Sequence, residues 1–174
     1  NILTTKEPGG TDIGLKIRDI LLDNNNTDLD EIAETLLFFA DRAQHYKEVY
    51  SKLDEYDLII TDRFVSSTYI YQHYMKNVDK ELLDYLYDKT LRGLKPDISI
   101  YILSEFPHNK VGMGEIKGDR LDEESYKHRQ DIIQWYENLN IGKDKMIVYT
   151  TEQYWKLYKE KIINSINLKL KEGN

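Results

Sequence analysis

The spacing of hydrophobic positions changes several times along this chain, and the changes predict alternating strands and helices. Short apolar runs typical of strands occupy residues 2–5, 57–61, 98–103 and 146–149. Between them, apolar residues recur at steps of three and four, the spacing that places side chains on one face of a helix. Strands that alternate with helices are typical of an α/β fold, here a parallel sheet flanked by helices on both faces.

Capping residues indicate where the first helices begin. Thr11 or Asp12 can cap a helix that ends near Leu22, and Asp28 or Asp30 can cap a longer one. Further helices are predicted at 66–74, 80–91, 124–139 and 154–170.

The longest predicted helix covers residues 29–53, and its apolar side chains form a regular stripe. The stripe consists of Leu29, Ile32, Leu36, Phe39, Ala43, Tyr46, Tyr50 and Leu53. We expect it to pack in the core, because the strand at 57–61 follows directly. Coiled-coil pairing would produce the same spacing.

Length and composition favour one globular domain, residues 1–174. A chain of 174 residues can bury a sizeable core, and 40% hydrophobic with 32% charged residues is typical of globular proteins. No apolar run approaches the roughly 18 residues that cross a bilayer. The absence of cysteine excludes disulfides and suits a reducing compartment. We therefore predict a cytoplasmic protein with no membrane partner.

The net charge of −7 disfavours binding along a nucleic-acid backbone, which depends on clustered basic residues. An anionic small molecule remains possible, because a few arginines in a cleft can outweigh a negative average surface.

Ligands of parallel sheets bind at the carboxyl ends of the strands, where Asp62 and Arg63 follow the strand at 57–61. A carboxylate there can orient the water shell of Mg²⁺, and a guanidinium can bind a phosphate through two donors. A surface ion pair or a helix cap explains the same two residues equally well.

Phe38 and Arg42 lie one helical turn apart, so their side chains can share one face at the edge of a cleft. An aromatic ring beside a fork of donors suits a nucleobase. Alternatively, Phe38 widens the core stripe and Arg42 pairs with Asp41 or Glu48. Arg18, on the first helix, is open to the same two interpretations.

These residues belong to motifs that follow one another in a fixed order. The motifs are Thr5-Lys6-Glu7-Pro8-Gly9-Gly10-Thr11, Ile17-Arg18, Leu37-Phe38-Phe39-Ala40-Asp41-Arg42-Ala43-Gln44-His45, Thr61-Asp62-Arg63, Ser66-Ser67-Thr68, Tyr71-Gln72 and Gly93-Leu94-Lys95-Pro96-Asp97. Their order and spacing resemble the bacterial and phage thymidylate kinases over most of the chain. The resemblance implies the fold of a P-loop nucleoside monophosphate kinase and phosphoryl transfer from ATP to dTMP, with Mg²⁺ as cofactor.

The resemblance also implies roles for single residues. Phe38 would stack on thymine and Arg42 would bond its carbonyl, while Arg63 and Arg18 would hold the acceptor phosphate. The side chains implied to line the base and deoxyribose are Ser67, Thr68, Tyr71 and Gln72.

Further implied roles concern the metal and the donor. Glu7 would face the phosphate and magnesium region, and Asp62 would assist the metal. A lid at about 105–122 would close over the donor phosphates with Lys117 and Arg120. The implied catalytic set is Asp62, Arg63 and Arg120. Family members are commonly homodimers through the helix at 29–53, and we expect a homodimer.

The glycine-rich P-loop, which ends in Gly-Lys-Ser/Thr, does not occur in these 174 residues. We therefore expect kinase activity to depend on a P-loop, with its strand, from residues outside this sequence. Two alternatives remain: a non-catalytic or split-subunit protein that binds deoxynucleotides, and a kinase for dUMP or another deoxynucleoside monophosphate.

Overall fold

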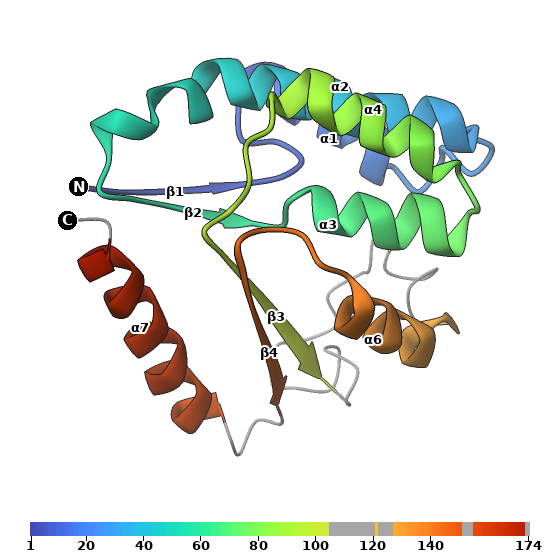
Figure 1. Cartoon of the computed structure of the whole chain (residues 1–174). Coiled ribbons are helices and arrows are strands. Elements are labelled where there is room, and N and C mark those ends of the chain that lie inside the picture. Colours follow the sequence, from blue (N-terminus) through green and yellow to red (C-terminus); the bar gives the residue numbers. More distant parts are fainter. Residues whose placement is uncertain (105–120, 122–126, 151–154, 173–174) are drawn as a thin grey trace. The chain divides into compact units, whose positions relative to one another are not determined.

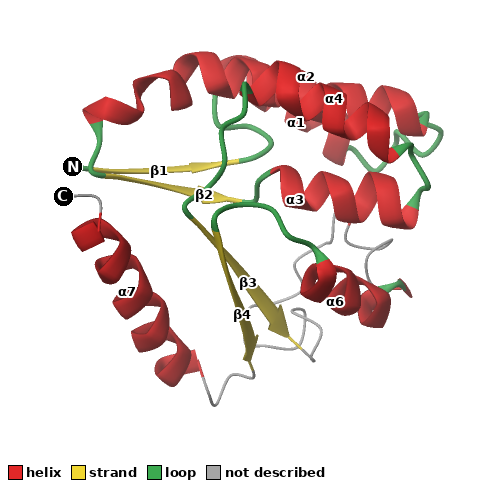
Figure 2. Cartoon of the chain, viewed as in Figure 1, coloured by secondary structure: helices red, strands yellow, loops and turns green. Residues whose placement is uncertain are grey.

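The computed structural model describes residues 1–104, 121, 127–150 and 155–172. Their contacts divide the chain into two compact units, the first built mainly on residues 1–94 and the second on 95–104 and 129–172. Each unit is described by itself (Figures 1 and 2). The single domain predicted for residues 1–174 stays a prediction.

The first unit contains two parallel strands, β1 (Ile2–Lys6) and β2 (Leu58–Asp62). The register runs from Ile2 opposite Leu58 to Lys6 opposite Asp62. The amide of Glu7 then donates to the Asp62 carbonyl at 2.9 Å, which extends the pairing by one residue. Both strands therefore end at the same edge, and the Glu-Pro-Gly-Gly loop follows β1 there.

Helices α1 (Asp12–Leu22), α2 (Glu31–Glu48) and α4 (Lys80–Leu91) gather on one side of β1 and β2 (Figure 1). Both α1 and α4 pack against α2. Thr11 caps α1 by accepting from the Gly14 amide at 2.9 Å. Asp30 caps α2 by accepting from two backbone amides of its first turn. The structure thus selects one residue from each predicted pair of caps.

The prediction of one continuous helix over 29–53 was wrong at its end. Helix α2 stops at Glu48, and a 3₁₀ segment, η1 (Tyr50–Glu55), follows with a non-helical residue, Lys52, inside it. The change of direction lets Tyr50 bury its ring beside the loop after β1. A tertiary contact therefore overrides the helical pattern.

The predicted core stripe was also wrong for part of its length. Phe39 is buried, but Ile32 and Leu36 are 41% and 47% exposed. The buried face of α2 consists of Glu34, Thr35, Phe38, Phe39, Asp41, Arg42 and His45. Periodicity cannot identify this face from sequence, because its polar groups are buried only by virtue of partners elsewhere in the chain.

After β2 the chain forms α3 (Val65–Thr68), which continues as a π-helical segment, η2 (Tyr69–Met75). Sequence periodicity predicted a single ordinary helix at 66–74. Short π segments are uncommon and often occur at functional sites. Thr68 and Gln72 are both buried here, one turn apart.

The second unit contains β3 (Ile98–Ser104) and β4 (Asp144–Thr150), again parallel. Helix α6 (Arg129–Asn138) contacts β3, since the Tyr136 and Tyr101 rings lie 4.9 Å apart, and α7 (Trp155–Glu172) contacts β4. The predicted start of α6 at 124 falls outside the described residues.

All strand pairing in the described ranges is parallel, in two ladders of two strands. This confirms the predicted α/β fold. Among the helices of these ranges, none combines the length and the apolar character that crossing a bilayer requires.

The α1–α2 contact gives a test of this packing. A Cβ on Gly14 would meet Asp41 Oδ1 and would lie 3.0 Å from Thr11 Oγ1. We expect Gly14→Ala to lower the free energy of unfolding by about 1–3 kcal/mol through overpacking, although alanine favours helices by about 1 kcal/mol over glycine.

Urea denaturation measures the change. Lys16→Ala, at an exposed position of the same helix, is the control and should stay within about 0.5 kcal/mol of the unmodified chain. A stabilised Gly14→Ala variant would contradict the α1–α2 contact.

Candidate functional site

The centre of the first unit is an ion pair between Glu7, which follows β1, and Arg42 of α2. Arg42 Nε donates to Glu7 Oε2 at 2.8 Å. Each residue is only 2% exposed. Removing one partner of such a pair leaves an uncompensated buried charge, which costs about 3–5 kcal/mol. The pair therefore joins α2 firmly to the end of β1.

The remaining contacts of Arg42 reach the segment after β2. One terminal nitrogen donates to Thr68 Oγ1 at 2.8 Å, and the other donates to the Phe64 carbonyl at 3.3 Å. The guanidinium carbon lies 5.8 Å from the centre of the Phe38 ring. Two predicted base-binding residues, Phe38 and Thr68, therefore both lie next to the Arg42 guanidinium.

The second carboxylate oxygen of Glu7 is also engaged. Tyr50 donates to Oε1 at 2.9 Å, and His45 Nδ1 lies 3.2 Å from the same atom. His45 Nε2 in turn lies 2.7 Å from Thr5 Oγ1. Burial alone would raise the pKa of Glu7, but the charge of Arg42 and the bonds from His45 and Tyr50 outweigh burial, so the pKa is lowered.

The Glu-Pro-Gly-Gly loop is held by contacts to α1 and α2. The Gly9 amide donates to Asp41 Oδ1 at 2.9 Å, and Arg18 donates to the Pro8 carbonyl at 3.0 Å. Gly9 has a φ of +98°, and a Cβ there would lie 2.9 Å from Arg18 Cδ. Only glycine suits this position, and Arg18 consequently lies directly against the loop.

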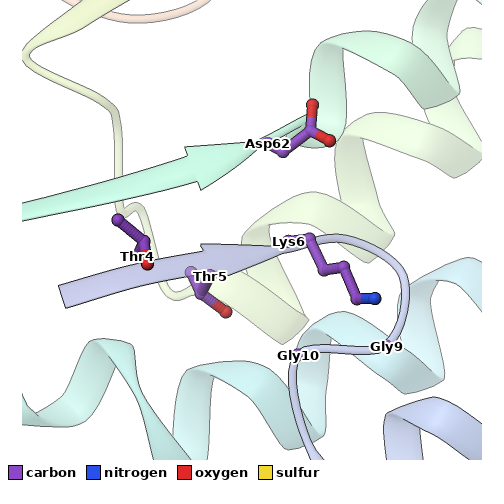
Figure 3. Close-up of a pocket in the computed structure, with 6 residues that line it drawn as sticks. All are labelled: Thr4, Thr5, Lys6, Gly9, Gly10 and Asp62. Carbon is purple, nitrogen blue, oxygen red and sulfur yellow. The ribbon is translucent and has the colours of Figure 1, made fainter. Parts of the chain in front are cut away.

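A cavity of about 450 Å³ lies at the shared end of β1 and β2. It is lined by Thr4, Thr5, Lys6, Gly9, Gly10 and Asp62, which Figure 3 shows on the two strand ends and the loop. The Lys6 side chain makes no hydrogen bond or ion pair with any described residue. The cavity therefore combines an available ammonium group with an exposed carboxylate.

Arg63 occupies the turn between β2 and α3 in a left-handed conformation, with φ of +66°. Its guanidinium carbon lies 5.7 Å from the centre of the Tyr71 ring, and one nitrogen lies 3.5 Å from Ser67 Oγ. The side chain is exposed. Arg63 therefore lies among two of the residues predicted to line the deoxyribose.

The predicted site residues fall into three neighbouring groups of the first unit. Phe38, Arg42 and Thr68 form one, Arg63, Ser67 and Tyr71 another, and Asp62 lines the cavity. Gln72 is buried and bonds Glu34. Lys117 and Arg120 lie outside the described residues.

The metal-binding role predicted for Glu7 does not fit its surroundings. Its oxygens face Arg42, His45 and Tyr50, and its side chain is shielded from solvent. Across the ranges that the structure describes, no cluster of three or more His, Asp or Glu side chains could hold a metal ion. Asp62, exposed at the cavity, is free of this objection.

Several residues of the site were assigned no binding role from the sequence, although Lys6, Asp41 and His45 lie within its motifs. Lys6 was named only as one residue of the motif at 5–11. Glu34, Asp41 and His45 each occupy ordinary helical positions, and their partners lie more than 30 residues away. A helical wheel that placed Phe38 and Arg42 inward would have indicated that Glu34 shares their face.

Comparison with known proteins gives consistent matches. The profile described as thymidylate kinase matches residues 1–162. The thymidylate kinase of Nostoc sp. is 34% identical over 173 residues, which cover 95% of this chain and 81% of that protein. That of Thermoanaerobacter sp. is 36% identical over 137 residues, 78% of this chain and 67% of that protein.

A solved structure supports the fold. The crystal structure of thymidylate kinase from Ehrlichia chaffeensis superposes with a TM-score of 0.67 at 24% identity, covering 94% of this chain and 80% of that one. The P-loop kinase fold predicted from the motifs is thereby confirmed.

The lowered pKa of Glu7 leads to a test by acid. Its folded pKa lies below the ordinary value of 4.5, so the ionised carboxylate stabilises the fold above that pH. This stability is lost as the pH falls through the folded pKa. In Glu7→Gln, we expect the free energy of unfolding to fall less between about pH 5 and about pH 3 than in the unmodified chain.

Urea denaturation at several pH values measures both curves. At neutral pH, Glu7→Gln should also be less stable by about 3–5 kcal/mol, because Arg42 loses its counter-charge. Glu31→Gln, exposed in the first turn of α2, is the control. Parallel pH curves for Glu7→Gln and the unmodified chain would contradict this role.

Proposed function

The chain belongs to the thymidylate kinase family, whose reaction is the transfer of a phosphoryl group from ATP to dTMP, and from this membership we propose which residues bind the acceptor. The enzyme forms dTDP for nucleotide biosynthesis. We propose that α2 and the segment after β2 together form the dTMP site. Neither a dUMP kinase nor a non-catalytic binder is favoured by any observation on the described residues.

The proposal rests on one observation: not all N–H donors of Arg42 are bonded within the protein. A guanidinium has five N–H donors, and three of them bond Glu7, Thr68 and Phe64. The other two have no protein acceptor among the described residues. A buried cation with two available donors beside the Phe38 ring suits a carbonyl on a flat base that stacks on that ring.

We assign the acceptor phosphate to Arg63 and Arg18. The exposed guanidinium of Arg63 can bind phosphate oxygens in two places, and Arg18 adds a second positive charge at the Glu-Pro-Gly-Gly loop. Ser67, Thr68, Tyr71 and Gln72 would then line the sugar and base. On the donor side, we carry over Lys117 and Arg120 from the family resemblance.

For Mg²⁺, Asp62 is the residue that fits. Its carboxylate is exposed in the cavity at the end of β2, where it can orient a hydrated cation. Magnesium would supply neutralisation of the phosphate charge during transfer. Glu7 instead positions Arg42, because its oxygens are already shared among three donors.

We also propose that the protein is a cytoplasmic homodimer. Ile32 and Leu36 expose large apolar surfaces on α2, on the face opposite the buried charges. Pairing of two such helices would bury these side chains. The absence of cysteine suits the reducing cytoplasm.

Arg63→Ala tests the phosphate assignment without disturbing the core. We expect dTMP affinity to fall about 10- to 100-fold, the effect of a lost charge-assisted bond, while thymidine affinity stays unchanged. Isothermal titration measures both. Arg92→Ala is a matched control, because Arg92 is an exposed arginine with a similar φ of +53°. Equal loss for both ligands would refute the assignment.

Leu36→Glu tests the dimer. Because a charge at this position cannot be buried in an apolar interface without a large cost, the variant should be a monomer where the unmodified chain is a dimer. Analytical ultracentrifugation measures the mass. Tyr85→Glu, on an exposed part of α4, should remain dimeric. A monomeric unmodified chain would rule out the dimer itself.

A further inference from the structure

A second buried charge lies two helical turns before Arg42 on the same face of α2. Glu34 is 0% exposed. Its Oε1 accepts from Gln72 Nε2 at 2.8 Å, and Lys76 Nζ lies 2.9 and 3.1 Å from its two oxygens. This group has no role in the phosphoryl transfer described above.

The two buried charges bracket Phe38. Glu34, Phe38 and Arg42 follow one another at one-turn steps along α2, as Thr68, Gln72 and Lys76 do along the segment after β2. Arg42 contacts Thr68 at one end, and Glu34 contacts Gln72 and Lys76 at the other. The ring predicted to stack on the base therefore lies between a cationic and an anionic contact.

The anionic contact determines which way the Gln72 amide faces. A carboxylate only accepts hydrogen bonds, so the NH₂ branch of the amide has to face Glu34. The oxygen branch is then directed away from Glu34, and it has no hydrogen-bond partner among the described residues. Because this oxygen is not among the buried side-chain atoms that lack a partner, it is accessible and can accept from a ligand that brings an N–H.

We propose that Glu34 is a positioning residue that holds Gln72 as a hydrogen-bond acceptor and thereby selects bases with a protonated N3. Thymine and uracil carry a hydrogen on N3, whereas cytosine has a lone pair there. The oxygen of Gln72 accepts a hydrogen bond from N3 of thymine or uracil, but it is repelled by the N3 lone pair of cytosine. This inference rests on the proposed dTMP site and adds to it the origin of base selectivity.

Lys76 supports this arrangement by pairing with Glu34. Its ammonium group lies close to both oxygens of Glu34 and balances the buried negative charge of that carboxylate. The ion pair therefore maintains an acceptor at Glu34 and, through it, an acceptor at the base.

Glu34→Gln is the test, because a second amide can either accept from or donate to Gln72. The dissociation constants of dTMP and dCMP are measured by titration calorimetry. We expect the ratio of the two constants to fall about tenfold or more. A loss of packing alone would weaken both ligands alike and leave the ratio unchanged. That result would overturn the proposal.

Three variants separate the possible failures. Glu34→Asp keeps an acceptor-only group and should retain most of the selectivity, while Glu31→Gln controls for loss of one negative charge on α2. Gln72→Leu should weaken the binding of dTMP. If the unmodified chain does not bind dTMP, the proposed function fails. If it binds dTMP but Glu34→Gln leaves the ratio of the dCMP and dTMP dissociation constants unchanged, only the positioning role fails.

A measurement on the unmodified chain avoids any folding defect of the variants. The side-chain amide protons of Gln72 should show nuclear Overhauser effects to the side chain of Glu34 when dTMP is bound. Their effects to the N3 imino proton of the ligand should be weaker than those to Glu34. Strong effects between the amide protons and the imino proton would place the NH₂ branch at the base and refute the proposal.

Discussion

The buried ion pair between Glu7 and Arg42 is the interaction on which the rest of the site depends. It joins the end of β1 to the middle of α2, two elements 35 residues apart in the chain. A buried charge has to be balanced by a partner and by further hydrogen bonds. Tyr50, His45 and Thr68 supply these bonds, so the pair determines the position of each.

This constraint explains why the inner face of α2 is polar. In most amphipathic helices the inward face is apolar, but here Glu34, Asp41, Arg42 and His45 point inward and Leu36 points outward. Arg42 pairs with Glu7 and Glu34 pairs with Lys76, while Phe38 supplies apolar surface between them. A base that stacks on Phe38 would therefore meet oriented donors and acceptors with little rearrangement of the protein.

The fold could be predicted from sequence wherever local signals act alone. Thr11 and Asp30 cap their helices through bonds within one turn, and β-branched runs form the parallel strands. The errors came where distant contacts compete with local preference. Helix α2 ends at Glu48 because burying Tyr50 against Glu7 requires a turn, and the segment after Thr68 adopts π geometry rather than an ordinary helix.

The sequence by itself determined the order of strands and helices. It also determined the position of Asp62 and Arg63 at the carboxyl end of a strand, because parallel strands bring these ends to one edge. Only the tertiary structure decided that Glu7 binds Arg42 and that Glu34 orients Gln72. These bonds join residues 35 and 38 positions apart. Such pairs leave no trace in helical or strand periodicity, which reports the face a residue shares with its near neighbours and not the partner it meets across the fold.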